Sequence, residues 1–90
     1  MAKIEDLRRK VALGLYELTS HAKMEMQADN FSLKDVKQGI YSGRIIERQR
    51  DPATSTKCCV SGKATDGRKL RSICRLTALG YLRIITVFEE

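Results

Sequence analysis

SLKDVKQGIYSGRIIERQR, residues 32–50, contains the change of periodicity that decides the fold. Before Gly43 the apolar residues recur at helical steps, and they are Leu33, Val36, Ile40 and Tyr41. Ser32 is an expected N-cap, with Asp35 three residues later in the capping-box position. After Gly43 the pattern changes toward the two-residue alternation of a strand. A helix is therefore expected to end at Gly43 and a strand to begin directly after it.

Upstream of this stretch the sequence predicts two more helices. Apolar residues at steps of three and four indicate one amphipathic helix within residues 1–18, with Ile4, Leu7, Val11, Leu15 and Leu18 on its buried face. Thr19-Ser20 then offers an N-cap for a second helix, in which Ala22, Met26 and Met24 are expected to face inward. Asp29-Asn30 is expected to end it, because Asn tolerates the left-handed conformation.

Downstream of residue 43 the sequence predicts strands joined by short turns. The expected strands are residues 44–50, 56–64, 69–76 and 81–88. The expected turns are Asp51 to Ser55, the Asp66-Gly67 hairpin and the segment around Gly80. Because short connections join antiparallel neighbours, the expected fold is α+β, with two to three N-terminal helices packed on a four-stranded antiparallel meander. Residues 1–90 are expected to form a single domain.

Charge is distributed unevenly along the chain. The 90 residues include 17 Lys plus Arg and 11 Asp plus Glu, a net charge of +6. Residues 44–90 hold ten of these cations and five of the acids, so 10 − 5 = +5 lies on the predicted strands. An excess of this kind favours an anionic partner without identifying it. The short apolar runs and the charged first residues predict no membrane span and no signal peptide.

Three cysteines, Cys58, Cys59 and Cys74, are expected to be reduced thiols in a cytoplasmic protein. Adjacent residues of a strand point to opposite faces, so the first two are not expected to pair. A zinc site needs four well-spaced ligands, and the single histidine lies far from the cysteines in sequence. The sequence therefore predicts no metal site and no cofactor.

Two constellations of residues are candidates for chemistry. His21, Glu25 and Asp29 stand at steps of four on one helical face, where a carboxylate can orient a histidine as a general base. The same spacing also suits an ordinary solvated pair that supports the helix. The second constellation is a basic surface on the strands, expected to contain Arg48, Lys57, Arg71, Arg75 and Arg83. It suits phosphates, although a solubilising solvent face has the same composition.

Strand alternation predicts which side chains share a face. In the third strand Arg71, Ile73 and Arg75 are expected on one face and Leu70, Ser72, Cys74 and Leu76 on the other. In the fourth strand the same rule groups Leu82, Ile84, Thr86 and Phe88. The few aromatic residues argue against a stacking platform for single-stranded nucleic acid.

Several segments resemble the small bacterial proteins grouped as domain of unknown function 4258. The resemblance covers residues 19–89, and its motifs are SHAKMEM (20–26), DNFSLKDV (29–36), GRIIERQ (43–49), the Asp66-Gly67-Arg68 hairpin and IITVFE (84–89). Many relatives have Arg where this chain has Glu25 and Asp29, and Tyr where it has Phe88. The family is similar to the RelE-like toxin superfamily, whose helices pack on an antiparallel sheet.

The resemblance implies the toxin of a toxin–antitoxin pair, acting as a metal-independent ribonuclease. His21 would be the base or acid, and Glu25 would orient it or share the proton work. Arg68, Arg71 and Arg75 would stabilise the charge on the phosphorane, and Lys57 would help to bind the substrate. The implied partners are an antitoxin protein, RNA or the ribosome, and a second copy of the chain in a homodimer. Two alternatives remain, a non-catalytic protein-interaction module on the same fold and a basic nucleic-acid-binding domain.

Overall fold

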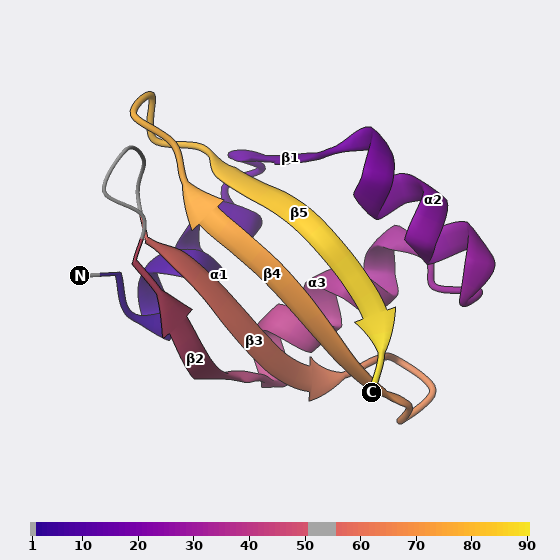
Figure 1. Ribbon diagram of the computed structural model, residues 1–90. Coiled ribbons are helices and arrows are strands. Elements are labelled where there is room, and N and C mark those ends of the chain that lie inside the picture. The colour runs from indigo at the N-terminus through magenta and orange to yellow at the C-terminus, as the bar shows by residue number, and fades with distance from the viewer. Residues whose placement is uncertain (1, 51–55) are drawn as a thin grey trace.

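The computed structural model describes residues 2–50 and 56–90, and it has an α+β fold (Figure 1). The described residues form three helices and a five-stranded mixed sheet with strand order β1-β5-β4-β3-β2. In chain order the elements are α1 (Ile4–Ala12), β1 (Tyr16–Leu18), α2 (Ser20–Ala28), α3 (Leu33–Ser42), β2 (Arg44–Gln49), β3 (Lys57–Lys63), β4 (Lys69–Leu76) and β5 (Leu82–Glu89). The turn expected from Asp51 to Ser55 lies outside the described residues. No helix in the described ranges is long and apolar enough to cross a membrane.

The first helix is shorter than the sequence predicts, and the sheet gains a strand. α1 ends at Ala12, and Gly14 adopts a φ of 74°, in the left-handed region. The chain then runs extended, and β1 pairs in parallel with β5, with Leu18 opposite Ile84. The expected four-stranded antiparallel meander is therefore incomplete: β2 to β5 form such a meander, and β1 adds a parallel edge strand. Leu15 and Leu18 fit the helical spacing of three residues, and the alternation of Tyr16, Glu17 and Leu18 in β1 is too short to compete with that pattern.

The helices cover one face of the sheet. α1 and α3 lie behind it in Figure 1, and α2 lies beside β5. Alternate residues of the strands are buried under the helices, among them Val60, Leu70 and Cys74. The predicted helix faces supply the rest of this core, with Leu7, Val11, Ala22, Met26, Val36 and Ile40 buried. Met24, expected to face inward, is 68% exposed. Within residues 2–50 and 56–90, no helix packs on the opposite face of the sheet.

Glycine allows α3 to approach the sheet closely. Gly39 of α3 lies against Gly62 of β3, and a Cβ at Gly62 would collide with the Gly39 carbonyl. A Cβ at Gly39 would in turn collide with the side chain of Leu70. Backbone contact of this kind leaves no room for a side chain between helix and strand. The close approach fixes where α3 ends relative to the start of β2.

A β-bulge in β5 changes which of its residues face the core. Ile73 pairs with Thr86 and Cys74 pairs with Ile84, so Ile85 is an extra residue in the ladder. Before the bulge Leu82 and Ile84 are buried, and after it Val87 is buried. The expected grouping of Leu82, Ile84, Thr86 and Phe88 is therefore wrong beyond Ile84. Thr86 and Phe88 lie on the open face instead.

Asp35 fastens α3 to the β3–β4 hairpin from a buried position. Its carboxylate accepts hydrogen bonds from the backbone and hydroxyl of Ser32, as the predicted capping box requires, and from those of Thr65. These bonds, the Thr65 hydroxyl first among them, lower the pKa of Asp35 from 3.8 to about 2 despite its burial. The carboxylate is thus a structural group shared by the helix and the hairpin.

Asp35→Asn is expected to make unfolding less dependent on acid. Because folding lowers the pKa of Asp35, its ionised form adds stability above about pH 4, and this is lost as the pH falls toward 2. A shift of that size corresponds to about 2 kcal/mol of unfolding free energy. At pH 6, urea unfolding should therefore give a lower unfolding free energy for the variant than for the wild type. This difference should shrink markedly near pH 2. An equal difference in unfolding free energy at both pH values would contradict this account.

Candidate functional site

Glu25 of α2 and Asp29, the C-cap residue of α2, bond to the backbone of β5 where β1 no longer pairs with it. Glu25 Oε1 accepts from the Val87 amide at 3.1 Å, and Asp29 Oδ2 accepts from the Glu89 amide at 3.0 Å. These two amides point away from β4 and would otherwise lack a partner at the sheet edge. The acidic face that the sequence predicted on α2 therefore satisfies the backbone of an edge strand.

His21 lies on the same face of α2, one turn before Glu25. Its Nε2 is 3.2 Å from Glu25 Oε1, and its side chain is 65% exposed. The structure thus brings together the two residues that spacing predicted as a pair. An exposed imidazole beside a carboxylate can exchange a proton with a bound molecule. The carboxylate is shared, however, because the same oxygen also accepts from the Val87 amide.

Arg68 connects the β3–β4 hairpin to the end of α2. Its guanidinium donates to the carbonyls of Asp29 and Asn30, at 2.7 and 2.9 Å, and to the Asp66 carboxylate at 2.7 Å. It also lies over the ring of Phe31, 4.3 Å from the centroid. The hydrogen bond to Asp66 raises the pKa of Arg68, and bonds to Arg68 lower the pKa of Asp66. With its nitrogens engaged in this way, Arg68 acts as a structural clasp.

The open face of the sheet carries basic side chains on several strands. The third-strand alternation is confirmed, since Leu70, Ser72 and Cys74 are buried and Arg71, Ile73 and Arg75 alternate with them. Strand register places further cations on the same face, namely Arg44, Lys57, Lys63, Lys69 and Arg83. Arg83 is paired with Glu17 of β1 at 2.7 Å. We call this surface the open basic face.

Arg48 does not belong to the open basic face, contrary to the sequence expectation. A second bulge, at Ile46, shifts the alternation of β2, so that Arg48 lies opposite the buried Cys58. Its guanidinium donates to the Ala2 carbonyl at 3.0 Å. Arg48 therefore ties β2 to the segment before α1.

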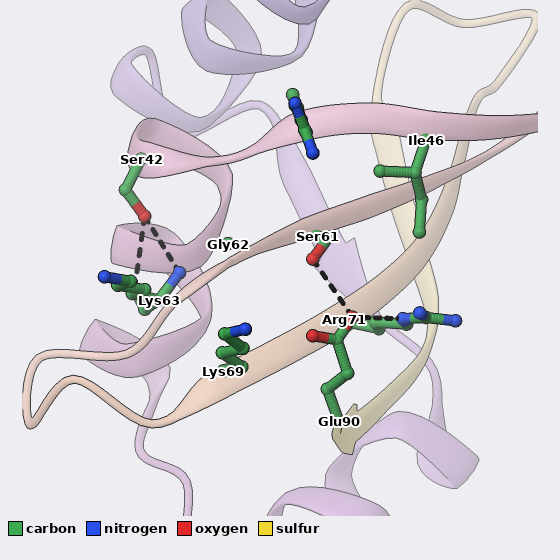
Figure 2. A pocket seen from close by; sticks show the side chains of 9 residues that line it. Ser42, Ile46, Ser61, Gly62, Lys63, Lys69, Arg71 and Glu90 are labelled. Carbon is green, nitrogen blue, oxygen red and sulfur yellow. Dashed lines mark hydrogen bonds and ion pairs between the residues drawn. The ribbon is translucent and has the colours of Figure 1, made fainter.

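A groove of about 570 Å³ lies at one end of the open basic face (Figure 2). Its cationic lining is Arg44, Lys63, Lys69 and Arg71, with Ser42 and Ser61 beside them. Glu90 is its one carboxylate, and it bonds to Arg71 Nε at 2.6 Å and to the Ser61 hydroxyl at 3.2 Å. That contact raises the pKa of Arg71 and lowers the pKa of Glu90. We call this hollow the cationic groove.

Two of these cations oppose each other directly across the hairpin. Lys63 and Lys69 are cross-strand partners, both are exposed, and neither makes an ion pair with another residue in the described part of the chain. Like charges in this position destabilise a sheet, and an anion between them would relieve the repulsion. Sequence reasoning did not select these lysines. The signal that would have found them is strand alternation, because Lys63 lies on the same face of β3 as Lys57 and Lys69 on the same face of β4 as Arg71.

A smaller hollow of about 150 Å³ adjoins the cationic groove, and Arg71 lines both. Its apolar floor is formed by Cys59, Ile73 and Phe88, one residue from each of β3, β4 and β5. Glu47, Gln49 and Lys57 provide polar groups around it. Desolvation by burial raises the pKa of the Cys59 thiol, so this sulfur is neutral and contributes as an apolar group.

The predicted site residues fall into three separate places. His21 and Glu25 lie together beside β5, whereas Arg71 and Arg75 lie on β4, on the far side of β5 from α2. Lys57 is one strand further away, and Arg68 is engaged at the end of α2. The structure therefore does not gather the six residues into one catalytic site. It provides a histidine–carboxylate pair at one edge and a basic surface on the open face.

The cysteines behave as apolar residues of the sheet. Cys58 and Cys59 point to opposite faces as predicted, and Cys58 lies across from Cys74 under the helices. All three are free, and burial raises the pKa of Cys74 to about 12. Across residues 2–50 and 56–90, no three His, Cys, Asp or Glu side chains gather in a way that would hold a metal ion.

Comparison with known protein families assigns most of the chain to one family. Residues 18–89 match the family described as domain of unknown function (DUF4258), and the chain belongs to it. The match begins at the last residue of β1 and spans α2 to β5, so it includes the α2–β5 edge and the open basic face. No curated protein and no solved structure matches the chain.

Arg68→Ala is expected to lower the melting temperature, whereas Arg75→Ala, its control on the open face, should leave it almost unchanged. The first change removes bonds to two backbone carbonyls and the contact with Phe31, while Arg75 makes no hydrogen bond or ion pair with the described residues. Thermal unfolding followed by circular dichroism measures both. Equal melting temperatures for the two variants would refute the clasp role of Arg68.

Proposed function

We propose that this protein binds single-stranded RNA on the open basic face of its sheet. The observation that carries the proposal is the cationic groove, where Lys63 and Lys69 oppose each other and four cations share the single lining carboxylate of Glu90. Phosphates are the groups that such a cluster of Lys and Arg suits best. The excess charge of residues 44–90 lies mainly on this face.

The apolar residues of the same face favour a single strand over a duplex. Phe88 and Ile73 lie between the cations, on a surface with no helix above it. A duplex presents its phosphates outward and keeps its bases stacked inside, so it would not use this apolar floor. The few aromatic residues argue against a platform on which several bases stack, but one unpaired base can contact this floor while the backbone phosphates stay near the lysines.

Replacing Lys63 and Lys69 together by Gln is expected to weaken RNA binding and to reduce its salt dependence. For a single strand the slope of log K against log salt is about −0.7 per phosphate contact, so losing two contacts should reduce it by about 1.4. Fluorescence anisotropy with a labelled ten-nucleotide RNA at several salt concentrations measures this.

The matched control is the double variant Lys23→Gln and Lys34→Gln. These lysines are exposed on α2 and α3, away from the open face, and their loss changes the net charge by the same amount. The control should keep the wild-type slope. Equal effects of the two double variants would show that only net charge matters and would defeat the proposed site.

RNA cleavage is a second candidate function, and the exposed His21 beside Glu25 favours it. One of the two groups would take the proton of the ribose 2′-hydroxyl, whose oxygen then attacks the adjacent phosphorus. The bond to the 5′-oxygen breaks, and the other group gives that oxygen a proton. This proposal includes the resemblance to RelE-like toxins. It also includes an antitoxin or the ribosome as partner, a homodimer and a cytoplasmic location. Glu25 and Arg68 also have structural contacts, which is why cleavage ranks second.

His21→Ala is expected to abolish cleavage, if the protein cleaves RNA, while leaving RNA binding intact. Loss of a general acid or base lowers the rate about 10²- to 10⁴-fold, and the exposed first turn of α2 tolerates alanine. Gel electrophoresis of RNA incubated with the protein, alone and with ribosomes, measures the rate. Full activity in the variant, or no cleavage by the wild type, would exclude this mechanism.

A further inference from the structure

We infer that the hollow beside Phe88 is a nucleobase site, which receives one unpaired base while a phosphate of the same strand occupies the cationic groove. This rests on the proposed RNA binding and specifies its substrate. The two hollows adjoin, and Arg71 lines both of them. A nucleotide has two parts that match these hollows: a base with apolar ring faces and an anionic phosphate, joined by the sugar.

The floor of the hollow suits the face of a base. Cys59 and Ile73 are cross-strand partners, and two residues further along β4 Phe88 lies opposite Arg71 on the same face. An aromatic ring beside a guanidinium is the combination on which unpaired bases stack. The side chains of Phe88 and Arg71 are only partly buried, so the floor remains open to a ligand.

The rim of the hollow can read the edge of a base. Glu47 and Gln49 of β2 line it, and neither side chain makes a hydrogen bond or ion pair with another residue in the described ranges. A carboxylate accepts a hydrogen bond from an exocyclic amino group, and a carboxamide can both donate and accept. Adenine, cytosine and guanine carry such an amino group, whereas uracil offers only its ring N3–H. The rim therefore favours the amino-bearing bases, adenine and cytosine among them, over uracil.

The first test compares Phe88→Leu with Phe88→Tyr. The leucine removes the ring and keeps an apolar residue, whereas the tyrosine keeps the ring. Affinities for ten-nucleotide oligo(A), oligo(C) and oligo(U) and for inorganic polyphosphate are measured by anisotropy or competition. Phe88→Leu should weaken binding of oligo(A) and oligo(C) about fivefold or more and leave polyphosphate unchanged, and Phe88→Tyr should resemble the wild type. Circular dichroism verifies that both variants are folded.

The second test is Glu47→Gln, which removes the acceptor pair of the carboxylate and one negative charge. The preference for oligo(A) and oligo(C) over oligo(U) should fall severalfold, while affinity for oligo(U) should stay the same or rise. An unchanged preference, or a wild type without preference, would overturn the base-reading rim.

The outcomes distinguish failure of the nucleobase site from failure of the RNA-binding proposal on which it rests. If wild-type protein binds all the oligonucleotides and Phe88→Leu binds them equally well, the nucleobase site is wrong and the RNA-binding proposal stands. If the wild type binds polyphosphate or poly-glutamate as well as it binds RNA, the face is a general polyanion or acidic-protein surface and both are wrong. Loss of RNA affinity in Phe88→Leu with retained polyphosphate affinity supports both.

Discussion

The bulge at Ile85, held by Thr19, is the constraint on which the open face depends. Thr19 donates its amide to the Ile84 carbonyl and its hydroxyl to the Ile85 carbonyl, and that hydroxyl also caps α2 by accepting from the Ala22 amide. One residue thus ends β1, fixes the extra residue in β5 and starts α2. Without the extra residue the alternation of β5 would continue, and Val87 and Phe88 would exchange faces. Phe88 would then lie under the helices rather than beside Arg71.

This arrangement gives the molecule one side whose polar groups bond to its own backbone and another side that is the open basic face. On the α2 side nearly every polar group selected from the sequence has a backbone partner, as Glu25, Asp29 and Arg68 show. On the open face, cations are placed opposite each other, and the side chains of Glu47 and Gln49 of β2 make no hydrogen bond or ion pair within the described ranges. Groups that satisfy one another stabilise a fold, whereas groups kept apart are suited to a ligand.

Local patterns in the sequence predicted the elements whose stabilising contacts are local. The capping box of Ser32 and Asp35, the left-handed Asn30, the Asp66-Gly67 turn and the faces of β4 follow from neighbouring residues. The parallel pairing of β1 with β5 could not be predicted in this way, because it joins segments more than sixty residues apart. The bulges at Ile46 and Ile85 have no distinctive residue type. The resemblance implied Arg68 as a charge stabiliser, and its bonds to the end of α2 could not be predicted because only the tertiary fold brings those partners to it.

The two edges of the sheet are protected by different means, and this bears on how the chain associates with copies of itself. Edge amides of β5 beyond β1 are occupied by the carboxylates of α2, so another strand cannot add there without displacing a helix. The other edge strand, β2, is unpaired on its outer side but carries charged residues and the bulge at Ile46. Both devices discourage edge-to-edge pairing, which is the first step toward aggregation. The two edges therefore resist strand addition, although one face of the same sheet is open.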